Sequence, residues 1–316
     1  FFLAKYVDGE LLYKKYKDSL IRIVKIFKNY GINVHFYIPI SYDPLYLKNN
    51  PQEATFLSPN KNNNNPYRDP ELKVVSLGSD KYLNYIKNIV KELIYDFDAD
   101  GIQLDYIRYP NINYGYEDKV KNRFIELGGD WNKILNIFRK GQNIFELYDQ
   151  NDKDVLLLGR VRSEFVTNFT GEIKSFISSI SSNILFSVTL IQSASSFLSY
   201  KDGGIDSYPY GFLHFGQDYT ELSNFCDFVC PLAYHKNYNK SVEWIREIIK
   251  NSKKRVNSKI LCGIGVNDTG ENIEKAIKIC NEEGVSFNLF RLGTFIPVNI
   301  EFEPTDIFSY SLKTSP

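Results

Sequence analysis

The sequence has 316 residues, and its 38 Lys and Arg residues balance its 38 Asp and Glu residues. This balance gives no support for a nucleic acid or an anionic membrane surface as a partner. No apolar run approaches the roughly 18 residues that a membrane-spanning helix needs, so we expect no membrane segment in this chain.

The first part of the chain alternates predicted strands and helices. A strand is predicted over residues 1–7, a helix over 12–30 that ends at Gly31, and a nearly continuous apolar strand over 32–40. After a long Asn-rich loop, residues 81–97 have the spacing of an amphipathic helix, which leads into a short strand over 102–106.

About fifty residues then precede the next long helix, and they contain two predicted short helices that begin at Trp131 and Asn143. Beyond them the predicted elements are a helix over 160–179, strands over 184–192 and 225–234, a helix over 242–250, a strand over 259–266, a helix over 271–283 and a strand over 285–290. Residues 193–221 read as a loop rich in Ser, Gly and Tyr.

A strand followed by a helix recurs about seven times, which indicates an α/β fold with a parallel sheet. We therefore predict a (β/α)8 TIM barrel forming a single domain over residues 1–316, with an insertion at about 111–158 over the barrel mouth. Seven strands are one short of eight. Because the chain lacks Met and begins at Phe1, we expect a fragment whose first βα unit precedes Phe1.

The stretch Asp98-Ala-Asp-Gly-Ile-Gln-Leu-Asp-Tyr-Ile-Arg-Tyr-Pro110 carries the main chemical signal. Alternation along its strand places Gln103 and Asp105 on one face, and Ile102 and Leu104 on the other. Asp105 stands at the carboxyl end of the strand, where barrel enzymes place their catalytic groups. A structural Asp that caps the loop is the alternative.

The four Cys residues and three His residues argue against a metal centre. Cys230 and Cys262 fall in predicted strands and Cys280 in a predicted helix, which favours buried thiols over disulfides. The sequence therefore predicts no metal site and no cofactor. A metal-dependent deacetylase would need His and Asp ligands at one strand mouth, which the spacing of His35, His214 and His235 does not favour.

The stretch around Asp105 closely resembles the signature strand of the glycoside-hydrolase-like barrels of bacteria and archaea, the group called glycosyl-hydrolase-like family 10 and its relatives. The resemblance continues through Val34-His-Phe-Tyr-Ile-Pro, the start of the Arg162 helix, Gln217-Asp-Tyr, the strand ending at Tyr234, Gly263-Ile-Gly265 and the strand after Gly284. It implies a TIM barrel that acts on a polysaccharide or cell-envelope glycan, and it favours a location outside the cell or in its envelope.

Two more distant similarities set limits on the mechanism. In the corresponding strand of family 18 chitinases, the position of Ile107 is the catalytic Glu, so the chitinase mechanism does not carry over. Amylase-like barrels hold a nucleophilic Asp at the end of the fourth strand, as Asp105 would be, but Gln192 stands where their acid Glu follows the fifth.

Glycoside hydrolysis requires two carboxyl groups across the scissile bond. We predict Asp105 as the nucleophile or stabilising carboxylate, and Glu164 or Asp218 as the general acid, with Asp43, Asp206 and Asp268 as further candidates. The predicted substrate-binding residues are Tyr37, Gln103, Tyr106, Arg108, Arg162, Gln192, Tyr234 and His235. A glycan-binding barrel without catalytic activity remains the alternative. The oligomeric state is open.

Overall fold

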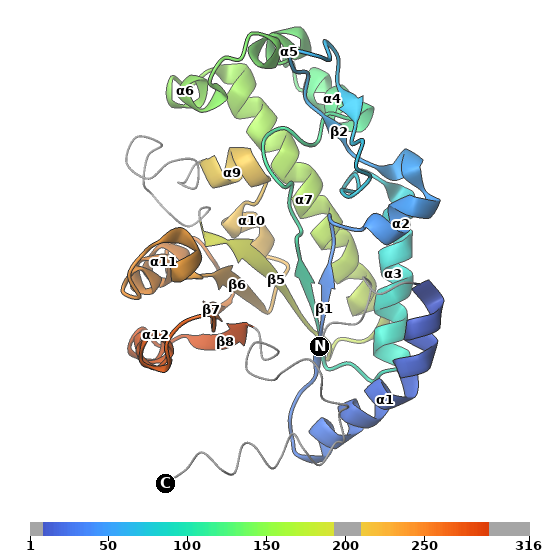
Figure 1. Ribbon diagram of the computed structural model, residues 1–316, viewed down its shortest axis with the longest axis vertical. Helices are drawn as coiled ribbons and strands as arrows, with labels where there is room; N and C mark the ends of the chain where they lie inside the picture. The colour runs from blue at the N-terminus through green and yellow to red at the C-terminus, as the bar shows by residue number, and fades with distance from the viewer. Residues whose placement is uncertain (1–8, 193–209, 291–316) are drawn as a thin grey trace.

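A computed structural model describes residues 9–192 and 210–290 (Figure 1). Six parallel strands form its main sheet, in the order β1-β4-β5-β6-β7-β8. The strands are β1 (His35–Pro39), β4 (Gly101–Asp105), β5 (Leu185–Ile191), β6 (Phe228–Leu232), β7 (Lys259–Gly265) and β8 (Ser286–Phe290). The predicted α/β class and parallel sheet are confirmed. The strand predicted over 1–7 lies outside the described residues.

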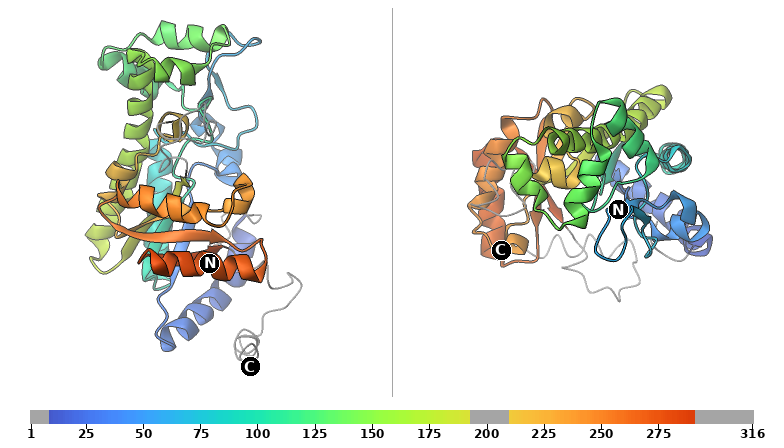
Figure 2. Two further views of the ribbon diagram at one scale, coloured as in Figure 1. Left: turned by 90° about the vertical axis from the view of Figure 1, so that its left-hand side faces the viewer. Right: turned by 90° about the horizontal axis from the view of Figure 1, so that it is seen from above.

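Helices connect consecutive strands of this sheet. The chain passes through α1 (Gly9–Asn29) before β1, α3 (Asp80–Tyr95) before β4, α7 (Lys153–Ile180) before β5, α11 (Trp244–Lys253) before β7 and α12 (Gly270–Glu282) before β8. Figure 2 shows α11 and α12 side by side on one flank, while Figure 1 shows α3 and α7 on the other. The sheet is a curled half-barrel; within the described residues it has six strands instead of the predicted eight.

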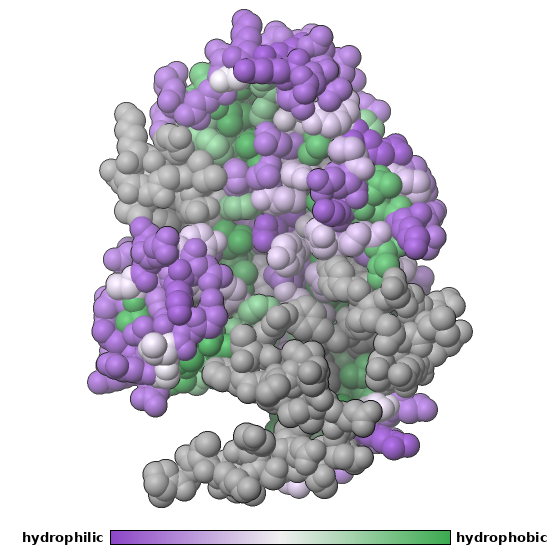
Figure 3. Space-filling model, in the orientation of Figure 1, coloured by the Kyte–Doolittle hydropathy of each residue, from purple (hydrophilic) through white to green (hydrophobic). Residues whose placement is uncertain are grey.

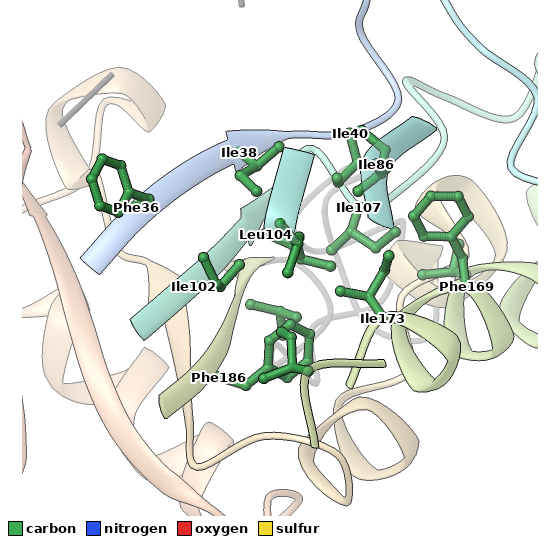
Figure 4. Packing of buried hydrophobic residues seen from close by; sticks show 14 of the residues in the cluster. Phe36, Ile38, Ile40, Ile86, Ile102, Leu104, Ile107, Phe169, Ile173 and Phe186 are labelled. Atoms are coloured by element: carbon green, nitrogen blue, oxygen red, sulfur yellow. The ribbon is translucent and has the colours of Figure 1, made fainter. Parts of the chain in front are cut away.

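Apolar residues on the outer face of the sheet form the largest core. Ile102 and Leu104 of β4 are fully buried there, together with Phe36, Ile38, Phe186 and residues of α3 and α7 such as Ile86 and Ile173 (Figure 4). A separate apolar cluster joins the outer faces of β7 and β8 to α11 and α12. Because side chains alternate along a strand, burial of these residues turns Gln103 and Asp105 to the inner face.

The residues after β4 form a subdomain with its own core. It contains α4 (Asp118–Glu126), α5 (Trp131–Arg139) and α6 (Ile144–Asp149), packed around Phe124, Trp131 and Ile134 against the first half of α7. Figure 1 shows these helices beyond the arrowhead end of β1. Helix α7 begins seven residues earlier than the sequence predicted, because Asp152 caps it by accepting from the backbone N–H groups of Asp154 and Val155.

Two predicted loops contain structure of their own. The loop after β1 includes α2 (Pro44–Asn49), the 3-10 helix η1 (Pro51–Glu53) and an antiparallel pair of short strands, β2 (Phe56–Leu57) and β3 (Tyr67–Arg68). The predicted loop at 193–221 contains α9 (Tyr210–Phe215) and the start of α10 (Tyr219–Ser223), and the 3-10 helix η3 (His235–Tyr238) follows β6. Among the described residues, no helix has the length and apolar character needed to cross a membrane.

Candidate active site

Asp105 is the last residue of β4 and lies on the inner face of the sheet at the carboxyl ends of the strands. Asp105 is paired in register with Pro39 of β1. The backbone N–H of Ile40, the residue after Pro39, donates a hydrogen bond to the backbone carbonyl of Asp105. On the other side, the hydroxyl of Thr189 in β5 donates a hydrogen bond to its carboxyl group. The backbone of Asp105 is thus held by the chain segment of β1, and its carboxyl group by β5.

The surroundings of Asp105 disfavour its charged form. The residue is only 5% exposed, and this burial raises the pKa of its carboxyl group above the usual value. Hydrogen bonds from Thr189 and from the backbone N–H of Tyr106, together with the charge of Arg108, oppose the shift in part. An Asp with a raised pKa retains a proton at higher pH than an exposed one, which is the property a general acid needs.

Three aromatic rings lie on the same inner face. The ring of Phe290, at the end of β8, stacks on Tyr234 with a centroid distance of 5.7 Å and an interplanar angle of 15°, and lies 6.5 Å from the ring of Tyr37 in β1. The proximity of Tyr37 in β1 and Phe290 in β8 shows that the sheet curls enough to bring side chains of its two edge strands together. Burial raises the pKa of Tyr234, and Asp105 contributes to the rise, so this phenol belongs to the surroundings of the carboxyl group.

Tyr106 and Arg108 follow Asp105 at the mouth. Tyr106 has a φ of 48°, in the left-handed region that a bulky residue rarely adopts, and the residue is 42% exposed. The guanidinium of Arg108 lies 4.6 Å from the centroid of the Tyr106 ring and 5.4 Å from that of Phe215 in α9. The backbone strain at Tyr106 is of the kind that functional sites tolerate.

Arg162, predicted as a substrate-binding residue, makes the contacts of a structural arginine. It is fully buried in α7, where Nε donates to the carbonyl of Leu213, Nη1 to that of Tyr114, and Nη2 to those of Asn111 and His214. Its guanidinium also stacks 4.0 Å from the centroid of the Tyr109 ring. Arg162 therefore joins the segment after β4 to α9.

The predicted general acids have partners that are typical of structural carboxylates. Glu164 forms an ion pair with Arg123 of α4, with 2.8 Å between Oε2 and Nε. Asp218 caps α10 by accepting from the backbone N–H groups of Thr220 and Glu221. These contacts account for both side chains without a role in proton transfer.

The other acidic candidates are also engaged where the structure describes them. Asp43 caps α2 and accepts a hydrogen bond from the hydroxyl of Tyr82. Asp268 lies 2.9 Å from Nε2 of His235, and the backbone N–H of Thr269 and the side chain of Asn272 help to lower its pKa to about 2. Asp206 lies outside the described residues.

The remaining predicted residues divide between the inner face and buried positions. Gln103 of β4 is 9% exposed and lies in register between Tyr37 and Ser187. Gln192 is buried directly after β5. His235, predicted to contact a sugar hydroxyl, is buried, and its Nε2 lies within hydrogen-bonding distance of the Asp268 carboxylate.

Sequence reasoning missed Thr189 and Gln217. The alternation of polar Ser187 and Thr189 with apolar residues along β5 was a signal for an inner-face hydroxyl beside Asp105. Gln217 donates to the carbonyls of Ile107 and Thr189 and accepts from the N–H of Ile191, so it ties the ends of β4 and β5 together. No local pattern marks a residue that acts over such sequence separations.

Metal chemistry has no obvious ligand set here. In the part of the chain that the structure describes, His, Cys, Asp and Glu residues nowhere gather in a group of three or more that could hold a metal ion.

Comparisons with solved structures identify the fold. A β-galactosidase from Marinomonas ef1 matches 90% of this chain with a TM-score of 0.60 and 11% sequence identity, and a family 42 β-galactosidase from G. stearothermophilus matches 87% with a TM-score of 0.55 and 12% identity. The fold is glycoside-hydrolase-like. The chain spans 47% and 43% of those two proteins, and such low identity establishes the fold alone. No family model and no curated protein matches the sequence, so the resemblance to family 10 rests on the motifs given above.

Proposed function

We propose that the protein is a glycoside hydrolase that acts on a polysaccharide or cell-envelope glycan, with Asp105 as its proton donor. The observation that carries the proposal is the buried carboxyl group at the carboxyl end of β4, held by Thr189 and bordered by Tyr234. A raised pKa suits protonation of the glycosidic oxygen better than nucleophilic attack, so we assign Asp105 the acid role instead of the nucleophilic one that position alone predicted.

The aromatic residues support a sugar as the substrate. Tyr37 lies in the middle of β1, Tyr234 follows β6 and Phe290 ends β8, and flat amphipathic rings pack well against the C–H face of a sugar. Figure 3 shows hydrophobic residues among pale and hydrophilic ones in the recessed middle of this face, whereas the parts over α5 and α11 are mainly hydrophilic. A partly apolar, partly polar recess is the usual lining of a small-molecule site.

A glycan-binding barrel without catalytic activity is the second candidate. One observation favours it: the described acids that were candidates for the second carboxyl group, Glu164, Asp218, Asp43 and Asp268, are each engaged in an ion pair, a helix cap or a hydrogen bond. Hydrolysis through two carboxyl groups needs a second one about 5 to 9.5 Å away. Binding of a glycan needs only the rings and the polar groups around them.

A reducing-end assay over a panel of envelope and plant polysaccharides separates the two candidates. We expect the wild-type protein to release reducing ends from at least one of them, and Asp105→Asn to lower the rate by about a hundredfold or more, as removal of a general acid does. The amide keeps an oxygen that accepts from Thr189, so the variant should fold. Asp118→Asn, an exposed acid on α4, is the matched control. Glycan binding without release of reducing ends by the wild type would establish the second candidate.

A further inference from the structure

Arg108 differs from the other arginine at this end of the sheet. Arg162 is fully buried and its guanidinium nitrogens donate to four backbone carbonyls, whereas Arg108 is half-buried and its guanidinium forms no hydrogen bond and no ion pair within the described part of the chain. Its side chain instead lies between the rings of Tyr106 and Phe215. A cation that is partly withdrawn from water and has no hydrogen-bonding partner is unusual, because desolvation of a charge is unfavourable unless the charge is paired.

Packing fixes Arg108 in this position. The backbone N–H of Arg108 donates to the carbonyl of Tyr106, which also accepts from the N–H of Ser41. The left-handed turn at Tyr106 therefore brings the ring and the guanidinium to the same side of the mouth, within the electrostatic reach of Asp105 and of Tyr238 in η3. Contact with these two rings holds the guanidinium in place while leaving its N–H groups for a ligand.

We propose that Arg108 binds the carboxylate of an acidic sugar, and hence that the glycan recognised here contains uronic acid units. A guanidinium presents parallel N–H donors that match the two oxygens of a carboxylate, and this geometry is more specific than a point charge. This inference rests on the proposed function for the kind of polymer, and it adds the chemical class of the sugar.

A carboxylate bound to Arg108 would also change the pKa of Asp105. The charge of Arg108 lowers the pKa of Asp105 at present, so a carboxylate bound to the guanidinium offsets that effect and favours the protonated, proton-donating form. Binding of an acidic sugar would thereby raise the protonated fraction of Asp105, the proposed proton donor.

Binding to the Asp105→Asn variant tests the inference without requiring hydrolysis. The probes are oligosaccharides of galacturonate, mannuronate and glucuronate, each compared by calorimetry with the same oligosaccharide after reduction of its carboxyl groups to hydroxymethyl groups. We expect at least one acidic oligosaccharide to bind about tenfold or more tightly than its reduced form, which is the ratio that a hydrogen bond between charged groups supplies.

Three further variants in the Asp105→Asn background assign that preference to Arg108. Arg108→Gln should abolish it, and Arg108→Lys should retain a part of it, because the ammonium keeps the charge but loses the planar donors. Arg160→Gln, which removes an exposed arginine of α7, should leave it unchanged. Thermal unfolding of each variant shows whether it is folded.

Equal affinity for acidic and reduced forms, a preference that survives in Arg108→Gln, or no binding of any acidic oligosaccharide would each overturn the inference. The proposed function would fail separately. Hydrolysis of a neutral glycan that depends on Asp105 would leave the glycosidase standing without the acidic sugar, whereas selective binding of a uronate without hydrolysis would leave the acidic sugar without the glycosidase.

Discussion

Replacement of Arg162 by Met should destabilise the protein strongly. The side chain is fully buried, and Met fills a similar length without donors, so the carbonyls of Asn111, Tyr114, Leu213 and His214 would lose their partner. An unsatisfied buried carbonyl costs roughly 1 to 3 kcal/mol, and relief of the buried guanidinium charge offsets part of the total. We therefore expect a loss of about 3 to 5 kcal/mol in the free energy of unfolding.

Thermal unfolding followed by circular dichroism measures this loss. At about 2 °C per kcal/mol for a chain of this size, the Tm should fall by roughly 6 to 10 °C. Arg160→Met is the control on the same helix, because the Arg160 side chain is 69% exposed and its contact is a 3.9 Å pair with Glu164; its Tm should change by about 1 °C or less. Equal Tm values for the two variants would refute the structural role and return Arg162 to the list of residues available to substrate.

Three further predictions concern the titratable groups. Thr189→Val removes the hydrogen bond that lowers the pKa of Asp105, so the alkaline limb of the pH–rate profile should move to higher pH; an unchanged limb would exclude Asp105 as the acid. Asp268→Asn should lower the Tm at pH 6. The difference in Tm between the wild type and the variant should narrow as the pH falls toward about 2, the pKa of Asp268 in the folded protein. A carboxylate whose pKa is lowered by folding stabilises the folded state fully above its pKa in the unfolded chain, and this stabilisation is lost as the pH falls through the folded pKa. Burial raises the pKa of Cys226 to about 12, and the other three thiols are buried, so a thiol reagent at pH 8 should modify less than about one Cys per native chain and all four after unfolding; rapid reaction of the native chain would contradict the burial.

Periodicity predicted the sheet and its main helices because those segments bury a regular face. β1 lies in a nearly continuous apolar run, and the stripe on α3 that includes Tyr82, Ile86 and Val90 is buried as its spacing indicates. The short helices α9 and α10 were missed, since helices of five or six residues complete too few turns for a period to appear. Capping side chains such as Asp218 define the short helix α10, and they also occur in ordinary turns.

The sequence predicted the position of a site residue only within a single strand. Alternation along β4 placed Asp105 on the inner face, and the hydrogen bond from Thr189 agrees with that placement. The sequence did not distinguish the roles of Arg108 and Arg162. Arg162 is buried and bonded to backbone carbonyls, whereas Arg108 lies over an aromatic ring without an ion pair in the part of the chain that the structure describes. The difference arises from α9, whose carbonyls meet Arg162 more than fifty residues away in sequence.

A comparison of Asp105 with Asn across pH distinguishes a functional carboxyl group from a structural one. Because burial raises the pKa of Asp105 in the folded state, its contribution to stability is present below the unfolded pKa and is lost as the pH rises through the folded value. Asn keeps an acceptor for Thr189 without a charge to bury, so Asp105→Asn should be the more stable protein at pH 8, by about 0.5 to 2 kcal/mol, with the gap closing toward pH 4. A residue present only to hold β4 and β5 together would show the reverse, with the variant weaker at every pH. If the amide is the more stable at pH 8, an acid at this position is best explained by a reaction that needs its proton.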